Sequence, residues 1–211
     1  MGLAGCTAAP KSAPPQMVSD STLGSLLLDV ADIDEIMGTN SMRTHPPVTS
    51  MGDHRNLLPN LNCLGVWQVD EAPIYDPSHW KSVRQQLLRT PDTDDWDNLV
   101  VQSVVSYRTV DGPRLFLDDS ADRWGQCTNH NVNIQLNNQR LPAWKSGDLT
   151  RTDDRLTMPY SRGSGDKVRS CQHVLQAVAN VIIDVAACGP QTSSFDKAAD
   201  VATRIEAKMP R

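Results

Sequence analysis

The distribution of apolar residues over positions 171–188 is typical of a β-hairpin. Two runs rich in β-branched residues flank a central Ala-Asn pair. If Ala179 and Asn180 form a tight turn, counting outward along the two strands places Cys171 opposite Cys188. Asn accepts the positive φ that such a turn requires, and a non-hydrogen-bonded pair of strand residues lies close enough for a disulfide. The pattern therefore predicts a hairpin whose register brings two cysteines together.

Hydrophobic periodicity elsewhere predicts a chain that mixes helices and strands. Apolar residues at helical spacing, with acidic first turns or a closing Gly or Pro, predict helices over residues 29–38, 61–69, 113–127 and 194–208. Runs of β-branched residues and alternating segments predict strands over residues 82–90, 99–108 and 128–137, and two short strands within 141–161. The expected N-cap of the last helix is Ser194.

The predicted strand over residues 128–137 alternates almost perfectly between two chemical faces. The apolar face consists of His130, Val132, Ile134 and Leu136. The other face carries four uncharged amides, Asn129, Asn131, Asn133 and Gln135. A half-buried strand explains the apolar face. The amide face fits two interpretations, a solvent-exposed surface and the polar wall of a ligand cleft, because amides both donate and accept hydrogen bonds and suit sugars and other neutral polar ligands.

Five cysteines indicate an exported protein. None of them has C-x-x-C spacing, so the usual zinc and thioredoxin-type motifs are missing, and we expect neither a metal nor a cofactor. Cys6 stands alone near the start, and the hairpin register pairs Cys171 with Cys188, which leaves Cys63 for Cys127. Such disulfides form outside the cytoplasm. The alternative is four buried free thiols in a cytosolic protein.

The first residues resemble the lipid-attachment signal of bacterial lipoproteins. Residues 3–6 read Leu-Ala-Gly-Cys, where the signal peptide would be cut before Cys6 and that cysteine lipidated. The basic and apolar regions of a signal peptide would have to lie before Met1. Residues 7–22 are rich in Pro, Ser and Ala, so we expect a disordered tether that reaches about 50 Å when extended. The predicted organisation is a lipobox-like start and tether over residues 1–22 and a single domain over 23–211.

Charge and hydropathy exclude several classes of partner. The 211 residues carry a formal net charge of −5 with acids and bases interspersed, which argues against a nucleic-acid surface. No apolar run reaches the roughly 18 residues of a membrane span, so membrane contact is expected only through the lipid on Cys6. The acidic cluster at 92–97 lacks the spacing of a calcium loop and is read as a solvated loop.

Four segments in this order resemble the extracellular sensor domain of the mycobacterial Ser/Thr kinase PknH, a family that also occurs as free-standing lipoproteins. They read LLLDVADIDEIMG, VVQSVVSY, ADRWGQC and CQHVLQAVANVIIDVAACG, and the resemblance covers roughly residues 25–209. It implies an α/β fold of the α+β type, with a mixed, mainly antiparallel sheet packed with helices. It also implies a central cleft proposed to bind an unidentified ligand. Family members have two disulfides, which supports the two pairings above. No kinase motif is present in the chain.

The preferred interpretation is an exported, lipid-anchored sensor domain without catalytic activity. Its ligand would be a small polar or envelope-derived molecule, and no pattern in the sequence defines an oligomeric state or a kinase partner. One alternative is a hydrolase in which Asp184 orients His173 as a general base, although no nucleophile motif accompanies them and a surface contact is the ordinary explanation. Another is a protein-interaction module anchored by Trp67, Trp80 or Trp144, each of which would ordinarily belong to a core.

Overall fold

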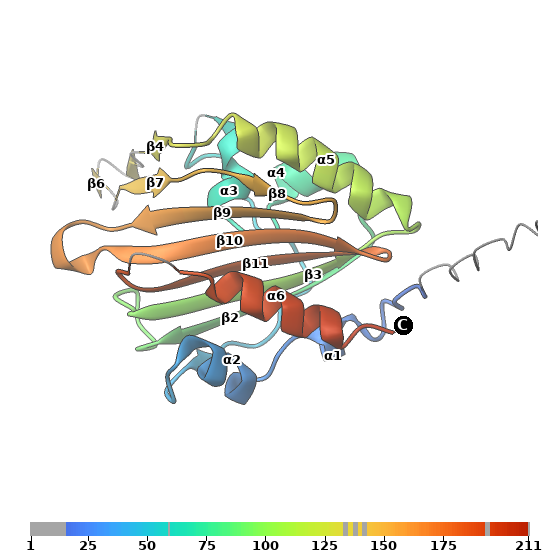
Figure 1. The fold of residues 1–211 in the computed structure, drawn as a ribbon, viewed down its shortest axis with the longest axis horizontal. Coiled ribbons are helices and arrows are strands. Elements are labelled where there is room, and N and C mark those ends of the chain that lie inside the picture. The colour runs from blue at the N-terminus through green and yellow to red at the C-terminus, as the bar shows by residue number, and fades with distance from the viewer. Residues whose placement is uncertain are drawn as a thin grey trace, which may run out of the picture.

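The fold is built around one large antiparallel β-sheet (Figure 1). The computed structural model describes residues 16–210 except 59, 133–134, 137–138, 141–142 and 193–194. Nine strands pair in the order β1-β2-β3-β11-β10-β9-β7-β4, with β8 on β9, and every strand pairing is antiparallel. These strands are β1 (Arg43–Thr44), β2 (Ser82–Thr90), β3 (Asn98–Ser106), β4 (Asn131–Val132), β7 (Trp144–Ser146), β8 (Thr150–Arg151), β9 (Arg155–Arg162), β10 (Arg169–Val178) and β11 (Val181–Pro190). A separate small hairpin consists of β5 (Gln135–Leu136) and β6 (Gln139–Arg140).

Helices cover both faces of the sheet. One face packs under α1 (Leu23–Leu26), α2 (Val30–Met37) and α6 (Lys197–Ala207), and buries side chains such as Val174 and Val185. The other face packs under η1 (Leu61–Cys63), α3 (Leu64–Trp67), α4 (Ala72–Tyr75), η2 (Asp76–Ser78) and α5 (Asp111–Gly125), and buries side chains such as Leu175 and Ile182. A short helical turn, η3 (Gly165–Lys167), lies between β9 and β10. No helix in the described ranges is long and apolar enough to cross a membrane. The expected α+β class, with a mainly antiparallel sheet and two disulfides, is confirmed.

The central hairpin β10–β11 has the predicted register. Cys171 lies opposite Cys188, and a disulfide joins them across a Cα–Cα distance of 4.0 Å. The turn residue with positive φ is Ala179, at 50°. Asn180, which was expected to supply the positive φ, has another role. Its buried side chain makes hydrogen bonds to the backbone of Val18 and to the carbonyl of Tyr107, and these join the turn to two other segments.

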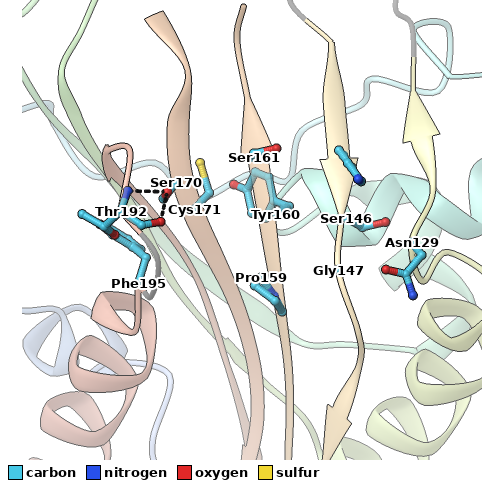
Figure 2. A pocket seen from close by; sticks show the side chains of 11 residues that line it. Asn129, Ser146, Gly147, Pro159, Tyr160, Ser161, Ser170, Cys171, Thr192 and Phe195 are labelled. Atoms are coloured by element: carbon cyan, nitrogen blue, oxygen red, sulfur yellow. Dashed lines mark hydrogen bonds between the residues drawn. The ribbon is translucent and has the colours of Figure 1, made fainter. Parts of the chain in front are cut away.

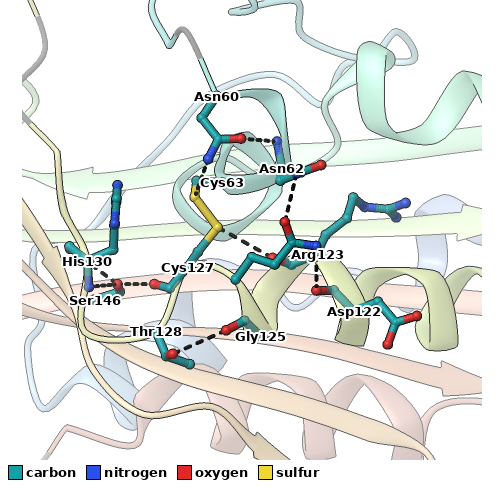
Figure 3. The surroundings of a disulfide bond; sticks show 11 residues. Asn60, Asn62, Cys63, Asp122, Arg123, Gly125, Cys127, Thr128, His130 and Ser146 are labelled. Carbon is teal, nitrogen blue, oxygen red and sulfur yellow. Dashed lines mark hydrogen bonds between the residues drawn. A yellow bond between two sulfur atoms is a disulfide. The ribbon is translucent and has the colours of Figure 1, made fainter.

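The second predicted disulfide joins Cys63 in η1 to Cys127 just after α5 (Figure 3). Their Cα atoms are 5.6 Å apart. Asn60 caps η1 by accepting a hydrogen bond from the backbone N–H of Asn62, and the Asn62 amide in turn donates to Gln126 near the end of α5. The crosslink therefore fastens the short helices of this layer to α5.

The segments at 128–137 and 61–69 differ from the predicted single elements. Asn129 has a φ of 52°, which interrupts an extended strand, so only Asn131 and Val132 form β4 on the main sheet. The helix expected over 61–69 is divided into η1 and α3 and ends when Gln68 adopts extended angles. In both segments, hydrophobic periodicity indicates which residues are buried. The backbone angles of single residues, Asn129 and Gln68, determine where the strand or helix begins or ends.

One of two further predicted helix starts is observed at the predicted residue, and the other lies later in the chain than predicted. The helix predicted at 29–38 is α2, capped by the Asp29 side chain and closed by Gly38 with a φ of 69°. The last helix, predicted over 194–208, begins at Lys197 with Asp196 at its N-cap position, and the predicted cap Ser194 lies outside the described residues.

Candidate ligand-binding cleft

A cavity of about 140 Å³ lies between the sheet and the segment 52–71. Its apolar floor is formed by the cross-strand pairs Val101–Ala186 and Leu99–Cys188 of β3 and β11. Directly paired residues project from the same face of a sheet, so all four point toward the helical layer above. Leu99 and Val101 nevertheless remain half-buried, which marks the part of this face that the helices do not cover.

Asp70 contributes a buried carboxyl group to this cavity. Its backbone has a φ of 44°, a left-handed conformation that Asp, like Asn, adopts more readily than most residues other than Gly. The residue is held in place because its N–H donates to Asp184 (2.9 Å) and its carbonyl accepts from the N–H of Gly52 (3.2 Å). The residue is 1% exposed, yet neither carboxyl oxygen makes a hydrogen bond of normal geometry to a described residue.

Burial raises the pKa of the Asp70 carboxyl well above its usual value, and the negative charges of Asp184 and Glu71 raise it further. The side-chain amide of Gln85 interacts with the Asp70 carboxyl group and lowers its pKa, which offsets part of this rise. A second polar group of the cavity is also unsatisfied, because the buried Trp67 Nε1 has no hydrogen-bond partner in the part of the chain that the structure covers. Buried polar groups are normally hydrogen-bonded, so two such groups in one cavity point to a partner that the chain itself does not supply.

We expect Asp70→Asn to make the protein more stable at neutral pH in the absence of ligand. The raised pKa means that the folded state keeps the proton on Asp70 after the unfolded chain has lost it, so the wild type loses stability as the pH rises above about 4. Asn carries no such penalty and tolerates the left-handed backbone. The gain should be on the order of 1 kcal/mol near pH 7, and should vanish below the usual aspartate pKa.

The measurement is urea unfolding of both proteins between pH 3.5 and 7.5. Asp153→Asn, at an exposed aspartate, serves as the matched control and should change stability equally little at every pH. A stability difference between wild type and Asp70→Asn that does not vary with pH would contradict this account of the buried carboxyl.

Glu71, the neighbour of Asp70, is also buried but has its hydrogen bonds satisfied. Its two oxygens accept from the backbone N–H of His54 (2.8 Å) and interact with His54 Nδ1 (2.5 Å). The His54 side chain is 47% exposed and also lines the cavity, so this pair lies where the cavity meets solvent. An isolated parallel bridge between Gly52 and Glu71 holds the two segments together.

Arg162 lines the cavity as a cation without an anionic partner. Its guanidinium lies over the rings of Trp96 and Trp144, 5.4 and 5.0 Å from their centroids, and forms no hydrogen bond or ion pair with any described residue. Burial lowers its pKa. Its cationic neighbours are paired, Lys167 with Asp95 and Arg169 with Asp97. Arg162 also lines an adjoining cavity of about 150 Å³ beside the loop that follows β2.

The proposed acid–base pair His173 and Asp184 does meet, but deep inside the protein. The His173 Nε2–Asp184 Oδ1 distance is 2.6 Å, and both residues are buried, so the expected surface contact is wrong. Asp184 also accepts from the Tyr75 hydroxyl (2.7 Å) and from Asp70 N–H, while His173 Nδ1 lies 2.7 Å from the Val66 carbonyl. Both ring nitrogens therefore face protein oxygen atoms, and neither is available to a substrate. The geometry is that of a structural network.

The four amides predicted as a cleft wall do not lie together. Asn129 borders a different, shallow hollow of about 360 Å³ beside β7, β9 and β10 (Figure 2). Its side-chain amide donates to Asp148 (2.7 Å). Asn131 is exposed on the edge strand β4. Asn133 lies outside the described residues, and Gln135 belongs to the separate β5–β6 hairpin. Their role in ligand binding stays a prediction, and none of the described ones lines the cavity beside Asp70.

The tryptophans considered as interaction anchors do not form an exposed patch. Trp67 and Trp144 are buried and contact each other edge to face, with ring centroids 6.1 Å apart. Trp80 is half-buried, and its Nε1 donates to Asp76. The first two instead form a wall of the cavity. Sequence reasoning did not select Asp70 or Arg162; the available signal was the consecutive acids Asp70 and Glu71 within a mostly apolar segment.

Together, the antiparallel sheet, the two disulfides and the partly enclosed cavity define a disulfide-stabilised α+β domain with a cavity on one face of its sheet. The model of the family described as "PknH-like extracellular domain" matches residues 18–208, and the chain belongs to this family. The resemblance seen in the sequence is thereby confirmed.

Similar proteins carry this domain as part of a longer chain. The serine/threonine-protein kinase PknH of Mycobacterium tuberculosis is 28% identical over 196 residues, which cover 93% of this chain and 30% of the kinase. The kinase PknJ of Mycobacterium bovis is 25% identical over 198 residues, covering 93% of this chain and 34% of PknJ. The chain thus spans about a third of the length of the kinases it matches.

A solved structure agrees in fold over nearly the whole chain. The crystal structure of the extracellular domain of PknH from Mycobacterium tuberculosis superimposes with a TM-score of 0.82 at 27% identity, covering 92% of this chain and 97% of that one. The sheet and its helical layers are therefore those of an extracellular PknH-like domain.

Proposed function

We propose that this chain is an exported sensor domain that binds a small ligand in the cavity beside Asp70 and performs no catalysis. The observation that carries the proposal is the Asp70 carboxyl group, which is buried and lines a cavity while neither of its oxygens makes a hydrogen bond of normal geometry to a described residue. A protein retains such a group at a cost in stability, and ligand binding is a function that offsets this cost.

The absence of catalysis is supported by the geometry of the candidate acid–base pair. His173 and Asp184 have their hydrogen-bonding atoms occupied by Val66, Tyr75 and Asp70. Proton transfer to a substrate requires a nitrogen within hydrogen-bond reach of it. In addition, the solved structure that matches is an extracellular domain of a kinase.

We also propose that the domain is held at the outer side of the bacterial cell membrane by lipid on Cys6, with residues 7–22 as the tether. The support is the Leu-Ala-Gly-Cys sequence followed by a segment rich in Pro, Ser and Ala. The test is mass spectrometry of the native protein from its host. A lipid-modified peptide beginning at Cys6 supports the anchor, and an unmodified Cys6 contradicts it.

Ligand binding is tested by thermal unfolding in the presence of fractionated envelope glycans and lipids. We expect at least one fraction to stabilise the wild type, since ligand at a hundredfold excess over its Kd adds about 2.7 kcal/mol. The same fraction should lose its effect on Asp70→Asn and retain it on the exposed-site control Asp153→Asn. Equal stabilisation of all three proteins, or no stabilisation by any fraction, would count against a ligand site at Asp70.

A further inference from the structure

The cavity holds two unpaired side chains of opposite formal charge. Neither carboxyl oxygen of Asp70 makes a hydrogen bond of normal geometry to a described residue, and its one polar neighbour, the Gln85 amide, is uncharged. Arg162 has no hydrogen-bond or ion-pair partner among the residues that the structure covers. The other charged groups nearby are paired, Glu71 with His54 and Arg169 with Asp97. The two free groups are thus the ones available to a ligand.

The two groups lie toward different ends of the cavity. The backbone N–H of Asp70 donates a hydrogen bond to Asp184 on β11. Arg162 lies in a different row of cross-strand pairs, in which Arg162 pairs with Arg169 and Arg169 pairs with Pro190 on β11. Asp184 and Pro190 are six residues apart on β11, so the two rows are separated by about 20 Å between Cα positions. The Arg162 side chain shortens this gap because it reaches into the cavity.

An apolar surface separates the two ends. The floor between the two rows consists of Val101, Ala186, Leu99 and Cys188, with the rings of Trp144 and Tyr160 at the side. Methylene groups would be removed from water here without leaving polar atoms unpaired. The arrangement therefore has an anion-binding end, an apolar middle and an acidic end.

We propose that the cavity binds an elongated small zwitterion, whose acidic group pairs with Arg162 and whose ammonium group pairs with Asp70. The inference rests on the proposed function and names the ligand class for that site. Arg presents a planar fork of donors that suits a carboxylate or phosphate, and its stacking between Trp96 and Trp144 restricts its orientation. The unpaired Trp67 Nε1 is a further donor in the same wall.

An ammonium group is favoured over a hydroxyl at the other end for an electrostatic reason. The carboxylates of Asp184 and Glu71 both act on Asp70 and disfavour its negative charge. A cation bound there would be attracted by Asp70 and would compensate that repulsion, whereas a hydroxyl would supply only a neutral hydrogen bond. A metal ion is a poorer fit, since no cluster of three or more His, Cys, Asp or Glu ligands occurs in the described ranges.

The volume limits the size of the enclosed part of the ligand. A cavity of about 150 Å³ in another protein accommodates benzene, so the 140 Å³ cavity encloses a ligand of roughly six to ten non-hydrogen atoms. A linear amino acid whose amino and carboxyl groups stand at opposite ends of a short methylene chain has this size and this charge pattern.

The experiment is isothermal titration calorimetry, which measures the affinity of the full chain for linear amino acids of increasing length. The series is 4-aminobutyrate, 6-aminohexanoate and 8-aminooctanoate. The matched probes that lack one charge are the alkanoate, the alkylamine and the terminal hydroxyalkanoate of the same length, which for the six-carbon member are hexanoate, hexylamine and 6-hydroxyhexanoate. We expect one chain length to bind best, and each single-charge analogue of that length to bind at least tenfold more weakly. Equal affinity for 6-hydroxyhexanoate or hexanoate would overturn the ammonium site, and no binding by any member of the series would overturn the inference.

Two variants assign the two ends. Arg162→Met should reduce the affinity advantage that the carboxylate gives by at least tenfold. Asp70→Asn should likewise reduce the affinity advantage that the ammonium group gives by at least tenfold. Arg43→Met and Asp153→Asn, at exposed positions, are the matched controls and should bind like the wild type. Loss of binding equal in the controls and in the cavity variants would contradict the assignment. If Arg162→Met fails to fold, Arg162→Gln replaces it, and the ligand comparison on the wild type decides by itself.

The outcome separates this inference from the proposed function. If an envelope fraction stabilises the wild type in a manner that depends on Asp70 while no linear amino acid binds, the sensor function stands and the zwitterion is wrong. If neither binds, both fail.

Discussion

Replacing Asp184 by Ala is expected to lower the free energy of unfolding by about 3–5 kcal/mol, because it removes one partner of a buried hydrogen-bonded His–Asp pair and leaves the other partners buried. The carboxylate accepts hydrogen bonds from Tyr75 and from the backbone of Asp70, and contacts His173 at 2.6 Å. Removal of the carboxylate leaves three buried donors without an acceptor. Denaturant unfolding monitored by Trp fluorescence measures the loss.

A matched control separates the loss of the whole carboxyl group from the loss of a single hydrogen bond to it. Tyr75→Phe removes one hydroxyl from the same network and keeps the ring, so it should cost only about 1–2 kcal/mol. The two losses should not add in the double variant, since both act on the same carboxylate. An Asp184→Ala protein as stable as Tyr75→Phe would mean that the His173–Asp184 pair contributes little to the fold.

Removal of the Cys63–Cys127 disulfide is expected to destabilise the domain by about 4 kcal/mol, and removal of Cys171–Cys188 by about 3 kcal/mol. In the chain-entropy account, the effect grows with the length of the loop that the crosslink closes, and the two separations are 64 and 17 residues. The first crosslink also fastens η1 to the end of α5, beside the hydrogen bond from Asn62 to Gln126. Paired Cys→Ala variants keep the side chains small and apolar.

The measurement is urea unfolding of the two double-alanine variants in a background of Cys6→Ser, which removes the fifth thiol and prevents exchange. The unfolding midpoint should fall further for Cys63→Ala/Cys127→Ala than for the hairpin variant. The reverse order would show that local strand pairing across Cys171 and Cys188, and not loop closure, dominates the effect of the disulfides.

Much of the fold could be predicted because its signals are local. Strand pairing in the central hairpin follows from a run of β-branched residues and a turn of two residues, and this register fixes which cysteines can pair. The α2 helix is bounded by the Asp29 cap and by Gly38, both of which act within one turn of the helix. The short strands around 128–151 were harder to predict, because the left-handed conformation of Asn129 sets where the pairing begins.

The candidate site was largely invisible in the sequence. The amide positions selected by alternation do not form the cavity wall, whereas Asp70 and Arg162 gave no periodic signal. Asp70 becomes notable only through its backbone angle, its burial and its missing partners, which depend on segments more than a hundred residues away, such as Asp184. An unpaired charge can be recognised only after every possible partner has been placed.

The sequence by itself determined the class of fold, the pairing of the four cysteines of the domain and the membership of the extracellular sensor family, since each depends on short-range patterns or on residues in fixed order. Only the tertiary structure decided that His173 and Asp184 are a buried structural pair and that Asp70 and Arg162 share a cavity. The physical reason is that burial and charge pairing are properties of residues distant in the chain, and they arise when the sheet and its helical layers pack together.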